Sequence, residues 1–147
     1  MPRVKTILPT LLLPVAMATA FAETLTINVE TEGPREGVIA ILVFNTEKGF
    51  PDEPEKAFMK ARFPVAAEGT TVCAVTNLPY GTYAVSVLHD INANYKSDKM
   101  LGLGPPKEPV GVSNAAGKLG GKPKFKQALF DFKAENNTIA VPVFYIF

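Results

Sequence analysis

The feature that most constrains the fold is a series of short segments in which apolar and polar residues alternate. Leu25, Ile27 and Val29 alternate with polar neighbours over residues 24–30, which is the period-two pattern of a strand with one buried face. Residues 82–88 repeat this pattern after a Pro- and Gly-containing turn. Further strands are predicted at residues 38–44, 63–65, 70–76, 128–133 and 138–147.

The order of these segments predicts an all-β domain of about seven strands. One short helix is expected over residues 54–60, with Pro54 in its first turn. Many short strands with turn residues between them are typical of an antiparallel, Greek-key-type β-sandwich, and a small barrel is the alternative. Residues 89–126 contain Gly and Pro throughout, so they are expected to form a long irregular loop.

Two of the predicted strands carry additional information. Residues 38–44 are apolar without interruption, as expected of a strand that is covered on both faces. Pro142 lies inside the last strand and cannot donate a ladder hydrogen bond. This strand is therefore predicted to lie at a sheet edge or to carry a bulge.

The first 22 residues have the composition of a cleavable secretory signal. Arg3 and Lys5 give a positive start, residues 7–18 are largely apolar, and Ala20-Phe21-Ala22 supplies the small residues at which signal peptidase cleaves. We therefore expect residues 1–22 to be removed and residues 23–147 to form one domain outside the cytoplasm, periplasmic or secreted. No later segment is long and apolar enough for a membrane-spanning helix.

Charge and cysteine content exclude several classes of protein. Without Arg3 and Lys5, 13 basic residues remain against 14 acidic ones, and the absence of a dense basic run argues against nucleic-acid binding. Cys73 is the only cysteine, so the chain forms no internal disulfide. It lies within an apolar run, where a small buried side chain is the expected role.

A segment after the 82–88 strand has the spacing of a cation-binding loop. With Asp90 as position 1, oxygen-bearing side chains occupy positions 1, 3, 5 and 9, and position 7 offers a backbone carbonyl. EF-hand loops surround Ca²⁺ with oxygen ligands at the same alternate positions. The candidate metal ligands are Asp90, Asn92, Asn94 and Asp98.

Only the front half of the calcium loop is present. Tyr95 replaces the Gly of position 6, and Leu101 replaces the bidentate Glu of position 12. With two carboxylates, a Ca²⁺ site is predicted to be weak, with a Kd of about 10⁻⁴ to 10⁻³ M. The alternative is that the Asp and Asn side chains only build successive turns. Zinc is not expected, since one His without a nearby thiolate is a poor start for a zinc site.

His89, the only histidine, precedes this loop and continues the apolar face of residues 83–87. It is therefore predicted to pack at the end of the core. Together with Asp90 it could instead provide the general base of a small hydrolase or isomerase, although no Ser or Cys nucleophile lies beside the pair in a recognisable motif. The favoured hypothesis is a noncatalytic module that binds a protein, glycan or envelope component through residues 89–126, and a purely structural role in the cell envelope is a further alternative.

The same long loop contains two further candidates. Ser113 and Asn114 lie in a run of small residues, 112–117, that is a second possible contact surface. The four lysines between residues 118 and 126 are interpreted as a solvated face, with an anionic partner as the alternative.

Several of these segments, in the same order, resemble a known bacterial family. The segments are Val43-Phe44-Asn45 through Gly49-Phe50-Pro51, Leu78-Pro79-Tyr80-Gly81-Thr82-Tyr83-Ala84-Val85, His89-Asp90-x-Asn92-x-Asn94 and Val112-Ser113-Asn114-Ala115. The chain resembles the uncharacterised family called domain of unknown function 2141 over nearly all of residues 23–147. That resemblance implies an exported β-sandwich, similar in outline to transthyretin-like and carboxypeptidase-regulatory-type domains, and it implies no particular activity.

Overall fold

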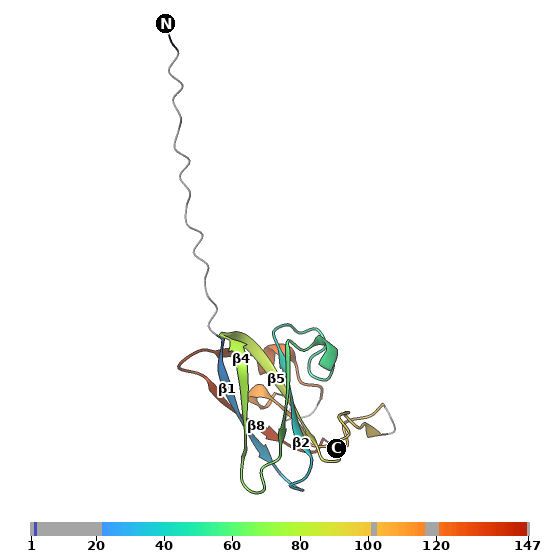
Figure 1. The fold of residues 1–147 in the computed structure, drawn as a ribbon. Helices are drawn as coiled ribbons and strands as arrows, with labels where there is room; N and C mark the ends of the chain where they lie inside the picture. The colour runs from blue at the N-terminus through green and yellow to red at the C-terminus, as the bar shows by residue number, and fades with distance from the viewer. Residues whose placement is uncertain (1, 3–21, 101–102, 117–120, 147) are drawn as a thin grey trace.

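The structure is a computed structural model that describes residues 2, 22–100, 103–116 and 121–146. The predicted signal residues therefore lie outside the described part, apart from Pro2 and Ala22, and their removal stays a prediction. Figure 1 shows the strands gathered into one body, with a segment after β5 that extends from it beside the C-terminal end.

Three strands form the smaller sheet, in the order β4-β1-β8. Its strands are β1 (Ala22–Thr31), β4 (Thr71–Pro79) and β8 (Thr138–Val143). β1 pairs with β4 in the antiparallel direction and with β8 in the parallel direction. The edge position predicted for the strand that contains Pro142 is confirmed, because β8 is the last strand of this sheet.

The larger sheet has the order β3-β2-β5-β6, and β7 pairs with the start of β5. All of these pairs are antiparallel. β5 is the central strand, since β2 lies along one edge while β6 and β7 share the other. The strands are β2 (Val38–Phe44), β3 (Met59–Pro64), β5 (Gly81–Asp90), β6 (Val110–Val112) and β7 (Phe130–Phe132).

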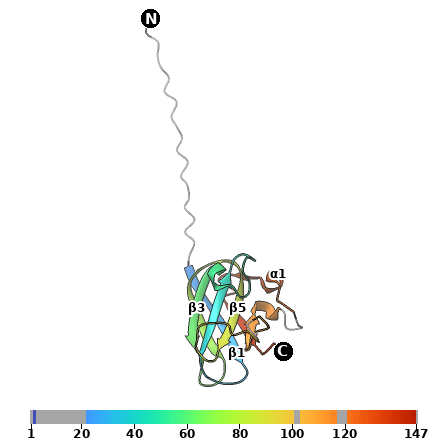
Figure 2. The same ribbon diagram turned by 90° about the vertical axis from the view of Figure 1, so that its right-hand side faces the viewer.

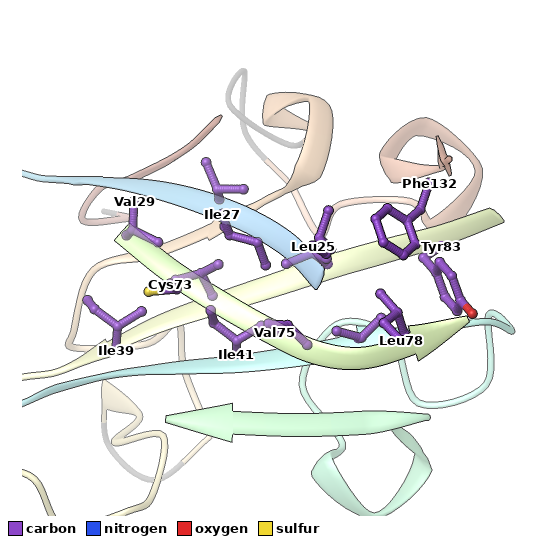
Figure 3. Close-up of a cluster of buried hydrophobic side chains, with 14 of the residues drawn as sticks. Leu25, Ile27, Val29, Ile39, Ile41, Cys73, Val75, Leu78, Tyr83 and Phe132 are labelled. Carbon is purple, nitrogen blue, oxygen red and sulfur yellow. The ribbon is translucent and has the colours of Figure 1, made fainter. Parts of the chain in front are cut away.

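The main core lies between the two sheets and follows from the alternation in the sequence. In β1, Leu25, Ile27 and Val29 are fully buried while the residues between them are only partly buried. Figure 3 shows these side chains pointing toward Ile41 and other apolar residues of the facing strands. Each such side chain contributes about 1.5–3 kcal/mol by leaving water. Cys73 is also fully buried here, as the sequence predicts.

The two sheets are joined at one edge by backbone hydrogen bonds. The Val110 amide donates to the Phe144 carbonyl at 3.0 Å, and the Phe144 amide donates to the Val110 carbonyl at 3.1 Å. The backbones approach closely beside this bridge, because a Cβ on Gly111 would lie 2.1 Å from the Pro142 carbonyl oxygen. A glycine is therefore required at position 111.

The all-β sandwich is confirmed, with two local corrections. The helix expected over residues 54–60 is wrong beyond Lys56: a 3₁₀ turn covers Pro54–Lys56 and β3 begins at Met59. Residues 59–64 alternate in burial, so strand pairing with β2 overrides the helical tendency. The β1–β8 pair is parallel because β8 enters from β7 of the other sheet rather than through a hairpin with β1.

The remaining regular elements are short. They are a 3₁₀ turn over Ser113–Ala115 and the α1 helix over Phe125–Ala128. The sequence predicted irregular chain up to residue 126 and a strand from residue 128, so α1, like β6, corrects the extent of the long loop. No helix in the described ranges is long and apolar enough to cross a membrane. In Figure 2, α1 and the orange turn over Ser113–Ala115 lie on the same side of the strands.

Candidate functional site

The outer face of the five-stranded sheet is apolar, and a second cluster of side chains covers one end of it. Phe44 on β2 and Ala84 on β5 point away from the main core and pack against Phe50 from the following loop. The Phe50 ring lies 5.4 Å from that of Phe44 and 5.6 Å from that of Phe125. Because this cluster spans β2, β5 and α1, it fixes the irregular segments over that end of the sheet.

The other end of the outer face is the floor of a groove with a volume of about 850 Å³. Ala40 and Leu42 of β2, Leu88 of β5 and Val110 of β6 form this floor, and each is only partly buried. Residues 38–44 are therefore apolar without interruption because their inner face packs against the smaller sheet and their outer face is covered by irregular segments. The walls come from irregular segments and include Pro51, Pro105, Pro106, Pro123, Phe144 and Ile146.

Charged side chains line the rim of the groove. Lys60, Arg62, Lys96 and Lys122 contribute cations, and Asp52 and Glu55 contribute carboxylates. Asp52 forms exposed ion pairs with Lys99 at 3.5 Å and with Lys122 at 3.3 Å. The Arg62 guanidinium lies 4.4 Å from the centre of the Tyr95 ring, a cation–π contact between β3 and the loop after β5. The rim therefore carries an excess of positive charge.

The loop after β5 is shaped by side-chain oxygens that accept hydrogen bonds from the backbone. The two Asp90 oxygens accept from the amides of Asn94 at 3.2 Å and Tyr95 at 2.8 Å. Asn92 Oδ1 accepts from the Asn94 amide at 3.1 Å, and Asn94 Oδ1 accepts from the Lys96 amide at 2.9 Å. These are the successive Asx turns that the sequence analysis gave as its alternative.

Three of the four predicted metal ligands also contact one another. The side-chain amides of Asn92 and Asn94 both donate to Asp98 Oδ2, each at 2.9 Å. Tyr95 adopts a φ of 63°, which is the left-handed conformation that position 6 of a calcium loop requires and that Gly usually supplies. Over the described residues, no group of three or more His, Cys, Asp or Glu side chains is arranged to hold a metal ion.

Glu108 is a residue that the sequence analysis missed. It is only 6% exposed, Oε1 accepts from the Ile91 amide at 3.0 Å, and Oε2 is buried without a hydrogen-bond partner. Burial is the main cause that raises the pKa of Glu108, and the charges of Asp90 and, more weakly, Asp98 add to the rise. The backbone amides of Ile91 and Asp98 lower the pKa and so oppose this rise. The sequence contains one signal for the importance of this residue: Glu108 is the only acidic residue between Asp98 and Asp131.

His89 and Asp90 do not form a pair. His89 is fully buried on the core face of β5, as predicted, and its Nε2 donates to the Glu36 carbonyl at 2.9 Å. Its Nδ1 atom has no hydrogen-bond partner. Asp90 follows on the opposite face of the strand and binds loop amides instead. Since no hydrogen bond joins the two side chains, the geometry gives no support to a His–Asp general base.

The other two candidates hold backbone segments together. Ser113 is buried, and its Oγ accepts from the Val85 amide at 2.9 Å and donates to the Ala128 carbonyl. The Asn114 side chain donates to the carbonyls of Gln127 at 3.2 Å and Leu129 at 2.7 Å. Both residues therefore attach the segment around α1 to the neighbouring strands.

Comparison with known proteins identifies a family of bacterial proteins. A family model described as "Uncharacterized protein conserved in bacteria (DUF2141)" matches residues 27–140. No curated protein and no solved structure matches the chain.

Proposed function

Since the chain belongs to the bacterial family DUF2141, whose description names no activity, we propose a function from the groove itself. The protein is an exported, noncatalytic binding module that takes up a small amphipathic molecule with an anionic head group. The observation that carries this proposal is the 850 Å³ groove with its apolar floor on the outer face of the larger sheet.

The size and lining of the groove are those of a small-molecule site. Ligand pockets typically have volumes of about 300–1,000 Å³ and are lined mainly by apolar side chains with a few polar groups. Here Leu42 and Leu88 face the open groove although apolar side chains gain free energy when they are covered. An apolar ligand body would cover them.

The rim favours a negative head group. Lys122 is neutralised by Asp52 at 3.3 Å, and Arg62 is stacked on Tyr95. Lys60 and Lys96 line the groove without an ion pair to any described residue. These two ammonium groups are therefore the ones available to an acidic head, and a cell-envelope lipid or a free fatty acid has the required chemistry.

Calorimetric titration with three decyl compounds tests this proposal. Decanoate, 1-decanol and decyltrimethylammonium share an apolar chain and differ in head-group charge. We expect decanoate to bind most tightly and the cation most weakly, with about tenfold between successive compounds. Equal affinity for all three, or no binding of any, would contradict the proposal.

Two pairs of variants locate the binding. Ala40→Phe fills the floor and is expected to abolish decanoate binding, while Val72→Phe introduces the same ring on an exposed face of the other sheet and should leave binding intact. Lys60→Gln is expected to weaken decanoate about tenfold without changing decanol, and the exposed Lys48→Gln is its control.

A further inference from the structure

The observation that goes beyond the groove is the buried carboxylate of Glu108 beside the loop after β5. Its Oε1 atom is held by the Ile91 amide, between two of the predicted metal ligands, and its Oε2 atom is buried with no hydrogen-bond partner. A buried carboxylate oxygen without a partner costs free energy unless a cation or proton compensates its charge. The nearby Asp98 amide offsets only part of this cost, and since no hydrogen bond reaches Oε2, this atom is able to accept a cation.

The fold brings Glu108 back to the loop through a short hairpin. The Lys107 amide donates to the Asp98 carbonyl at 2.8 Å, and Lys99 and Pro106 form an isolated antiparallel bridge. Because these contacts close the chain between residues 98 and 107, Glu108 emerges next to Asp98. Position 12 of a calcium loop supplies a Glu ligand, which Leu101 does not, and Glu108 is an acidic residue that the returning chain brings to the same loop.

The loop itself carries four oxygen-bearing side chains. The Asn92 and Asn94 side chains already meet at Asp98 Oδ2, and a half-turn of each amide would present oxygen in place of nitrogen. The charges of Asp90 and Asp98 both act on Glu108. Three carboxylates and two amides form an all-oxygen donor set, which is the chemistry that Ca²⁺ prefers.

We propose that the 90–98 loop and Glu108 bind a calcium ion, with Asp90, Asn92, Asn94 and Asp98 as ligands from the loop and Glu108 as the ligand from the returning chain. The three carboxylates are not drawn to one point in the structure. Binding therefore includes a local closure, in which the Asn amides turn and the Asp98 carboxylate moves toward Glu108. The site lies beside the groove but does not depend on what the groove binds.

Thermal unfolding of the protein with Ca²⁺ or chelator is the first test. We expect millimolar CaCl₂ to raise the melting temperature by about 4 °C relative to EDTA, and MgCl₂ at equal concentration to raise it much less. Tb³⁺ provides a direct readout, since an ion bound beside Tyr95 is excited through the tyrosine ring and Ca²⁺ displaces it. A melting temperature that is indifferent to Ca²⁺, or equal shifts with both salts, would overturn the proposal.

The Glu108→Gln variant distinguishes a metal ligand from a structural residue. In EDTA we expect it to melt at or above the temperature of the original protein, because the unpartnered charge is gone while the bond to the Ile91 amide is kept. In Ca²⁺ the order reverses, since the variant loses the calcium shift and the Tb³⁺ signal. A lower melting temperature in EDTA together with an unchanged calcium shift would show that Glu108 is only structural.

Two further variants complete the experiment. Asp98→Asn removes a ligand from a partly exposed position where folding is not at risk, and it should reduce the calcium shift by at least half. Glu135→Gln removes an exposed carboxylate after β7, which pairs with the start of β5 rather than with its end, and should leave the shift unchanged. Decanoate binding is measured in EDTA, so a failure of the calcium site and a failure of the proposed groove function give different results.

Discussion

The two faces of β2 and β5 share one backbone and differ in how they are covered. On the inner face, Ile41 and Val87 are fully buried against the three-stranded sheet. On the outer face, Leu42 and Leu88 are only partly buried beneath irregular segments. The inner cover is a second pleated surface with the same period of two, whereas the outer cover consists of irregular segments, held by the apolar cluster around Phe44 and Phe50 at one end and by individual hydrogen bonds and ion pairs elsewhere. The inner face therefore supplies stability, and the outer face is free to adapt to a ligand.

Neighbouring residues on β2 give the largest expected contrast between the faces. Ile41→Ala is expected to lower the free energy of unfolding by about 2–5 kcal/mol, because it leaves a cavity in a closed layer. Leu42→Ala, one residue further, should cost only about 1 kcal/mol, since its side chain is already half in the open groove. Urea unfolding followed by circular dichroism measures both. Equal losses would mean that the outer face is packed as tightly as the core.

The hydrogen bonds that hold the outer cover should give an intermediate effect. Ser113→Ala leaves the buried Val85 amide without its acceptor and is expected to cost about 1–3 kcal/mol. Thr82→Ala removes an exposed bond to Asp131 and should change stability by less than about 0.5 kcal/mol. Amide hydrogen exchange should show faster opening around α1 in the first variant only. An unchanged exchange pattern would contradict the attachment inferred for Ser113.

The exclusion of water from the inner layer can be tested through Cys73, whose contribution to stability changes with pH only in alkaline solution. Burial raises the pKa of its thiol from 9.0 to about 11. The folded protein therefore holds the proton more tightly than the unfolded chain, so this contribution to stability is present below pH 9 and is lost as the pH rises toward 11. Cys73→Ala should lack this component of the pH dependence. In mildly alkaline buffer, a thiol reagent should label Cys73 only after unfolding.

The contrast between the faces also explains what the sequence could predict. The alternation in Leu25, Ile27 and Val29 indicates a strand with one face against a second sheet. The strands and the burial of His89 at the end of the core could therefore be predicted from the local pattern. The helix expected over residues 54–60 failed because the pairing of β3 with β2 is a long-range contact. Glu108 was missed for a similar reason, since its place beside Asp90 depends on a hairpin whose closure no local pattern encodes.

The bridge between Val110 and Phe144 has a consequence for how the two sheets separate transiently. It joins the two sheets by backbone hydrogen bonds along the side where β6 and β8 meet. At the opposite side, no ladder connects β3 with β4 among the described strands. Transient separation of the two sheets should therefore start between β3 and β4 and admit solvent there first. The floor of the groove lies on the outer face of the larger sheet, away from the space between the two sheets, so this opening leaves the floor in place.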